Sequence, residues 1–107
     1  MTEHKVVVRI FFAKMKQEFF ELAEDERAAF MRKDRSNLDD LGMKPISMIN
    51  CSGFTSEWDY IGVEEWPSLE AIRLRERFEI DELDISRFVE YRTYQGEPES
   101  FRYYGKA

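Results

Sequence analysis

The first apolar run of the chain has apolar side chains on both of its faces, and this constrains the fold more than any other feature. Residues 6–12 are β-branched and aromatic residues with no glycine or proline among them, which predicts a strand. Successive strand residues point to opposite sides, so even and odd positions form two faces. The even positions are all apolar, and Arg9 is the one charge among the odd positions. We therefore expect a sheet that is covered on both faces.

The remaining patterns give the order strand, helix, strand, strand, helix, strand. The expected strands are residues 6–12, 45–51, 57–66 and 87–94, and the expected helices are residues 24–41 and 68–80. Gly42 ends the first helix and Ser68 is the N-cap of the second, whereas residues 17–23 are either a separate helical turn or a loop. With right-handed crossovers this order closes into an α+β fold, the ferredoxin-like β-α-β-β-α-β arrangement of an antiparallel sheet with two helices on one face.

Chain length and composition predict one domain that gains from self-association. The 107 residues fit a single domain, with a core over about residues 5–94 and an irregular C-terminal tail over residues 95–107. A domain of this size buries only about 60 to 70 % of its chain surface on folding. Aromatic residues make up 15 % of the chain although 36 % is charged, so the aromatic rings need more buried surface than one copy offers.

Charge and cysteine usage exclude several classes of partner. The net charge is -6 and no run of Lys or Arg exceeds two residues, which argues against nucleic-acid binding and against a membrane surface. The longest apolar stretch, residues 6–13, contains Arg9 and is far shorter than the roughly 20 residues of a membrane span. Residues 1–5 have no signal-peptide pattern and the chain has one cysteine, so we expect a cytoplasmic location. One cysteine and one histidine cannot form a structural zinc site, and we expect no metal.

Three details of the sequence resemble the dimeric α/β-barrel superfamily. They are the length, the strand that ends in residues 65–71 (EWPSLEA), and the aromatic fourth strand. The run of residues 20–30 (FELAEDERAAF) is in addition similar to the darcynin-like proteins, a small family of unknown activity. The superfamily resemblance implies a homodimer in which two ferredoxin-like sheets pack face to face with the helices outside. The superfamily includes cofactor-free monooxygenases, haem-degrading monooxygenases, haem-dependent chlorite dismutases and muconolactone isomerases, so the fold does not fix the function.

The same resemblance implies a pocket between the sheet and the helices, lined by the aromatic residue that ends the third strand. That residue is Trp66, and strand parity then places Trp58, Tyr60, Gly62 and Glu64 on its face. Gly62 would leave room beside the rings. On the first strand the matching face carries Val7, Arg9 and Phe11.

The expected helices also direct charged residues toward the sheet. In the first helix Phe30, Leu38 and Leu41 define the inner stripe, and Arg27 and Asp34 fall within it. In the second helix the stripe has Glu76 at its centre, and its apolar members are Leu69, Ile72, Ile80 and Leu83. A buried charge without a partner costs several kcal/mol, so these charges must pair, be hydrated or serve a ligand.

These residues could form an active site that needs no cofactor. Glu64 or Asp34, if desolvated, could act as a general base on an acidic carbon or a phenol, and Arg9 could stabilise the enolate or phenolate. We expect no cofactor, and in particular no haem, because residues 68–83 contain no histidine for an axial ligand. The expected ligand is an aromatic small molecule, and the candidate ligand-binding residues are Asn50, Trp58, Tyr60, Trp66, Glu76 and Tyr91.

An alternative explains the same residues without a ligand. Inward charges are often paired at the edge of a stripe, and aromatic residues dominate ordinary cores and interfaces. Two functions therefore stay open, a small homodimeric enzyme of monooxygenase-like or isomerase-like type and a non-catalytic dimeric binding or assembly protein. A cavity lined by the candidate residues would favour the first function, and a packed interior with paired charges would favour the second.

Overall fold

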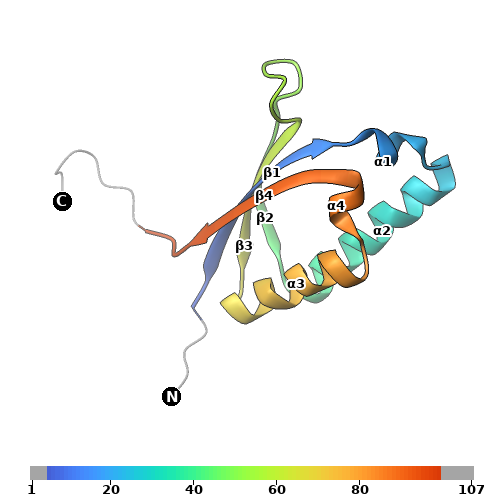
Figure 1. Ribbon diagram of the computed structural model, residues 1–107. Coiled ribbons are helices and arrows are strands. Elements are labelled where there is room, and N and C mark those ends of the chain that lie inside the picture. Colours follow the sequence, from blue (N-terminus) through green and yellow to red (C-terminus); the bar gives the residue numbers. More distant parts are fainter. Residues whose placement is uncertain (1–4, 100–107) are drawn as a thin grey trace.

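A computed structural model describes residues 5–99 of the chain. The elements follow one another as β1 (Val7–Met15), α1 (Gln17–Glu21), α2 (Glu24–Asp40), β2 (Lys44–Asn50), β3 (Tyr60–Trp66), α3 (Leu69–Asp81), α4 (Ile85–Phe88) and β4 (Val89–Gly96). The four strands form one antiparallel sheet in the order β2-β3-β1-β4. The helices lie together on one side of this sheet (Figure 1). The expected β-α-β-β-α-β fold is confirmed, with two short helices added to it.

The local signals for the helix ends act as expected. Ser68 Oγ accepts a hydrogen bond from the Ala71 backbone N–H at 3.1 Å, which caps α3. Gly42 follows the end of α2 with φ +80°, a left-handed conformation that favours glycine. The segment that could have been a loop or a turn forms the short helix α1, and the Glu26 side chain accepts from the Ala23 backbone N–H at the start of α2.

All four strands differ from the expected bounds at one or both ends. The first strand continues to Met15, three residues beyond the expected end, and the second covers Lys44–Asn50. The third strand begins at Tyr60, not at residue 57, because residues 51–59 form a long connection from β2. The fourth strand begins at Val89 after α4, and it extends to Gly96, two residues into the expected tail. The rest of that tail from residue 100 onward lies outside the described residues.

The covered face of the sheet carries two apolar clusters with charged residues between them. One cluster is built on Trp66 and Ile72, and the other on Ala13, Phe88 and Val89. Along β1, Val7 packs against the first cluster and Phe11 against the second. Arg9 lies between these two residues on the same side of the strand, so the polar part of the interior sits at its middle.

The opposite side, which we call the open face, is mostly apolar, and Arg92 of β4 lies there opposite Phe12. No helix of residues 5–99 lies over it (Figure 1). Strand register and ring contacts place there Val8, Ile10, Phe12, Ile49, Trp58, Ile61, Val63 and Tyr94. Tyr94 and Ile49 are more than half exposed. One face of the sheet is thus left without cover by residues 5–99.

Candidate functional site

The centre of the covered face is an ion pair between neighbouring strands. Arg9 on β1 stands directly opposite Glu64 on β3, so both side chains point toward the helices. Arg9 Nε donates to Glu64 Oε1 at 2.8 Å, and the two residues are 0 % and 6 % exposed. A charge-assisted hydrogen bond of this length inside a protein is among the stronger polar contacts.

Trp66 completes the strand side of this site. Its indole Nε1–H donates to the same Glu64 Oε1 at 3.0 Å, and the residue is completely buried. The Arg9 guanidinium carbon lies 5.1 Å from the centroid of the Trp66 ring, a cation–π arrangement. Arg9, Glu64 and Trp66 therefore meet where strand parity places them.

Helix α3 supplies the second half of the polar interior. Arg75 Nε donates to Glu79 Oε2 at 3.0 Å, one helical turn apart, and both residues are buried. Arg9 Nη2 lies 3.5 Å from the same Glu79 Oε2, and the Tyr91 hydroxyl of β4 donates to it at 3.2 Å. Glu79 thus joins α3 to two strands of the sheet.

Arg75 also ties α3 to α2. Its Nη2 pairs with the Asp34 carboxylate, and its Nη1 donates to Asn37 Oδ1 at 3.0 Å. The Asp34 side chain is 25 % exposed, so this end of the chain of contacts reaches the surface. We call the connected set the polar network, and its members are Arg9, Asp34, Asn37, Glu64, Trp66, Arg75, Glu79 and Tyr91.

The surroundings fix the protonation of two members of the polar network. Burial lowers the pKa of Arg9, but the neighbouring Tyr91, Glu64 and Glu79 raise it more, so the guanidinium stays charged. Burial and the Glu79 carboxylate raise the pKa of Tyr91 well above its ordinary value. The Tyr91 hydroxyl therefore keeps its proton and acts as a hydrogen-bond donor.

One part of the polar network lacks partners. Arg9 Nη1 and Nη2 are buried and make no hydrogen bond with any residue of the described chain, although Nη2 is within ion-pair distance of Glu79. Buried polar groups in proteins are almost always hydrogen-bonded, and an unsatisfied one costs about 1–3 kcal/mol. These two nitrogens are the place where an additional acceptor would stabilise the structure.

Three of the predicted ligand-binding residues lie away from this centre. Trp58 is on the opposite face, because it precedes the first residue of β3 and its ring packs on Phe12 with the centroids 5.6 Å apart. Asn50 is exposed at the end of β2 and binds Ser52. Tyr60 begins β3 and is 37 % exposed. The expectation that Trp58 shares a face with Trp66 is therefore wrong.

The inner stripe of α3 also differs from the expected one. Ile80 is 72 % exposed and Leu69 37 %, whereas Ile72 is fully buried. The helix is rotated so that Arg75 and Glu79 hold the central inward positions, and Glu76 lies beside them, half-buried. In α2 the expected stripe is observed, with Leu38 buried and Asp34 turned toward α3.

The space expected beside Gly62 is taken by Phe11. A Cβ atom at Gly62 would overlap the Phe11 ring, which lies against Gly62 and stacks on Tyr91 with the centroids 6.0 Å apart. Gly62 therefore makes room for a side chain of the protein itself.

Sequence reasoning missed Arg75, Glu79 and Asn37. The first two carry a usable signal, because an Arg and a Glu four residues apart can pair along one helix face. Asn37 has no comparable signal, since its role depends on how α2 and α3 pack together.

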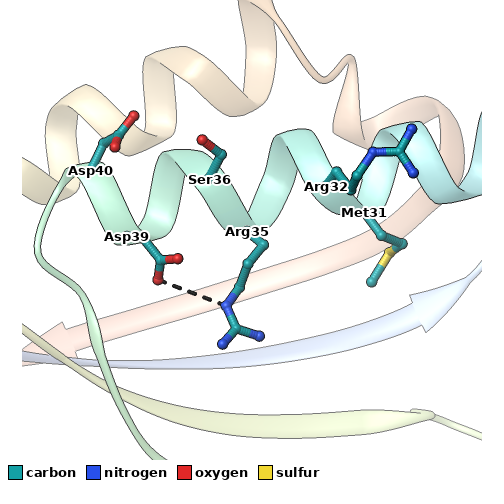
Figure 2. Close-up of a pocket in the computed structure, with 6 residues that line it drawn as sticks. All are labelled: Met31, Arg32, Arg35, Ser36, Asp39 and Asp40. Carbon is teal, nitrogen blue, oxygen red and sulfur yellow. Dashed lines mark ion pairs between the residues drawn. The ribbon is translucent and has the colours of Figure 1, made fainter.

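A shallow hollow in the structure lies on the surface of α2, away from the polar network. Figure 2 shows its six lining residues, Met31, Arg32, Arg35, Ser36, Asp39 and Asp40. All six are exposed, and the Arg35–Asp39 ion pair drawn there spans 3.7 Å between side chains that are 79 % and 66 % exposed. This hollow is a solvated helix surface and contains none of the predicted site residues.

Comparison with solved structures identifies the fold. A chlorite dismutase from Candidatus Nitrospira defluvii, in complex with imidazole, matches with a TM-score of 0.70 and 13% identity over 95% of this chain and 43% of that chain. The chain thus spans less than half the length of chlorite dismutase. A hypothetical Arabidopsis thaliana protein matches with a TM-score of 0.63 and 11% identity over 96% of this chain and 97% of that chain.

A protein of unknown function from Rhodopseudomonas palustris matches with a TM-score of 0.58 and 17% identity, over 92% of this chain and 85% of that chain. No protein-family model and no curated protein matches the sequence. At these identities the likeness concerns the fold alone: the chain has the fold of the dimeric α+β-barrel proteins. Within residues 5–99, none of the helices combines the length and the apolar character that crossing a membrane requires.

The residues of this interior do not fit a haem group. Helix α3 directs Arg75 and Glu79 toward the sheet, and both are already paired. The single histidine of the chain, His4, lies outside the described residues.

Proposed function

We propose that this chain forms a homodimer and binds an aromatic small molecule in the layer between its sheet and its helices. The observation that carries the binding role is the Arg9 guanidinium, which is completely buried while Nη1 and Nη2 have no hydrogen-bond partner among the described residues. Buried polar groups are almost always hydrogen-bonded, so these two nitrogens support an acceptor that the described residues do not supply.

The open face supports the homodimer. Its central side chains Ile10, Phe12 and Val63 are apolar, and charged residues such as Lys44 and Glu65 stand at its rim. An apolar centre with a polar rim is the usual anatomy of a protein–protein interface. Two such faces would cover each other in a sheet-to-sheet dimer, the arrangement that the dimeric α/β-barrel resemblance implies.

A cofactor-free monooxygenase-like or isomerase-like activity would require Glu64 to accept a proton from the substrate. Its Oε1 already accepts hydrogen bonds from Arg9 and Trp66. A substrate proton would have to reach Oε2 or displace one of these donors. We therefore place binding before turnover. If turnover occurs, Glu64→Gln will abolish it while ligand binding remains, and unchanged turnover in this variant would remove Glu64 as the base.

A non-catalytic assembly role is the second candidate, and the pairing of the polar network favours it. Arg75 has three partners on two helices, and Glu79 accepts from two residues on different elements. Such contacts hold layers together without any ligand. The darcynin-like resemblance of residues 20–30 and a cytoplasmic location remain predictions from the sequence.

The two tryptophans provide a test of both parts of the proposal. Trp66 lies in the polar network and Trp58 beside the open face, so their indole N–H signals in a ¹⁵N–¹H correlation spectrum report on the two sides of the sheet. Trp58→Phe assigns the signals. We expect dilution to shift the Trp58 signal through dissociation, and phenol to shift the Trp66 signal in a saturable way. If neither phenol nor any other aromatic compound shifts the Trp66 signal, only the assembly role remains.

A further inference from the structure

We propose that the ligand of this interior is electrically neutral and offers a carbonyl oxygen, which accepts hydrogen bonds from Arg9 Nη1 and Nη2. This inference rests on the proposed binding function and adds the chemical class of the ligand. A buried arginine needs both hydrogen-bond acceptors and negative charge, and around Arg9 only the acceptors are lacking.

Acceptors are in short supply around Arg9. A guanidinium carries five N–H groups, one on Nε and two on each terminal nitrogen. The Nε–H is used by Glu64, and the terminal nitrogens make no hydrogen bond within residues 5–99. Both terminal nitrogens are excluded from solvent, so water at the surface cannot serve them. The end of the Arg9 side chain therefore lacks hydrogen-bond acceptors.

Negative charge is already abundant at the same place. Glu64 Oε1 lies 2.8 Å from Arg9 Nε, and Glu79 Oε2 lies 3.5 Å from Nη2. The polar network as a whole joins two arginines to the three carboxylates of Glu64, Glu79 and Asp34, so one carboxylate is in excess. The raised pKa of Arg9 agrees with this surplus, because the neighbours outweigh the effect of burial. A ligand that brought another negative charge would increase an imbalance that the low dielectric of the interior penalises.

The geometry also limits how a ligand can approach. The Trp66 ring covers the Arg9 guanidinium with 5.1 Å between the guanidinium carbon and the ring centroid. The donors left without an acceptor are the terminal N–H groups of Arg9, so a ligand oxygen would have to lie in line with them. The Tyr91 hydroxyl donates to Glu79, and neither terminal nitrogen of Arg9 makes a hydrogen bond to its oxygen.

Benzamide and benzoate test this inference, because they have nearly the same shape and differ in charge. Each is titrated into the complete protein at pH 7, and the Trp66 indole N–H signal is followed. We expect benzamide to bind in a saturable way and about tenfold more tightly than benzoate, the ratio that a penalty of about 1.4 kcal/mol would give. Benzoate that binds equally well or better, with the same shift of Trp66, would overturn the neutral-ligand inference and leave the binding function intact.

A matched variant shows whether Arg9 is the contact. Arg9→Lys keeps the positive charge beside Glu64 and Glu79 but lacks the two terminal nitrogens of the guanidinium. We expect it to lose the response of Trp66 to benzamide. If this variant does not fold, Arg9→Gln with Glu64→Gln removes one charge of each sign and takes its place. Benzamide binding that survives in the folded variant would overturn the inference, and so would crystals grown with benzamide that hold only an ordered water at Nη1. If neither compound shifts Trp66, both the inference and the binding function fail.

Discussion

On the covered face of the sheet, β1 presents Arg9 between Val7 and Phe11, whereas on the open face the same strand presents the apolar side chains of Ile10 and Phe12. The charge is buried, and no part of the described chain covers the apolar residues. A single strand therefore meets opposite requirements on its two sides.

The two faces obtain their stability in different ways. The covered face contains charges that are stable only because Glu64 and Glu79 pair with Arg9 and Arg75. The open face has no such pairs among its central residues, and its apolar area becomes favourable only when something covers it. Changes on the covered face should therefore act on folding, and changes on the open face on association.

The largest effect is expected from breaking the central ion pair. Glu64→Leu leaves Arg9 buried without its nearest carboxylate, and removing one partner of a buried pair costs about 3–5 kcal/mol. We expect the free energy of unfolding, measured by urea denaturation at one protein concentration, to fall by that amount. Asp39→Ala is the control, because it breaks the exposed ion pair with Arg35 and should cost less than about 1 kcal/mol. Equal losses in the two variants would show that burial does not strengthen the central pair.

A smaller effect is expected from adding one methyl group beside the polar network. Gly62→Ala places a Cβ where the Phe11 ring lies, and overpacking of this kind costs about 1–3 kcal/mol. Gly53→Ala is the matched control, since a Cβ there meets nothing within 4 Å. We expect the melting temperature to fall in the first variant only, and to recover when Phe11→Leu is added to Gly62→Ala. A normal melting temperature for Gly62→Ala would mean that the Phe11 ring moves aside easily.

The smallest effect concerns Tyr91 at alkaline pH. Its pKa in the folded protein is raised above the ordinary value of about 10, so the unfolded chain loses the Tyr91 proton first as the pH rises. The stability linked to this proton is complete below about pH 10 and declines above it, with a slope of up to about 1.4 kcal/mol per pH unit. We expect the unfolding free energy of the wild type to fall more steeply above pH 10 than that of Tyr91→Phe. Parallel curves would contradict a raised pKa for Tyr91.

The order of the elements could be predicted from the sequence because their periodicities are clear. The strand and helix patterns gave the β-α-β-β-α-β order, and Ser68 and Gly42 marked helix ends that the structure confirms. The error at Trp58 arose because parity was counted through residues that precede β3. Parity holds only inside a strand, and nothing in residues 57–59 shows that they lie outside it.

The candidate site was less accessible to sequence reasoning. The barrel resemblance put Trp66 on the covered face, and parity then placed Arg9 and Glu64 there. Their direct pairing depends on the register of β1 and β3, which the sequence does not contain. The expected apolar stripe of the second helix was right for Ile72 and Leu83, which are buried, but wrong for Leu69 and Ile80. The helix also buries Arg75 and Glu79. A buried ion pair looks like a solvated one in the sequence, because only the packing of α3 against the sheet distinguishes them.

The most direct measurement of the difference between the two faces is the molar mass in solution by light scattering. If a second copy covers the open face, the wild type will have twice the 12.9 kDa mass of one chain. Val63→Asp at the centre of the open face will have the mass of one chain, with an unchanged circular dichroism spectrum. A wild-type protein that stays monomeric at every concentration tested would show that no second copy covers the open face.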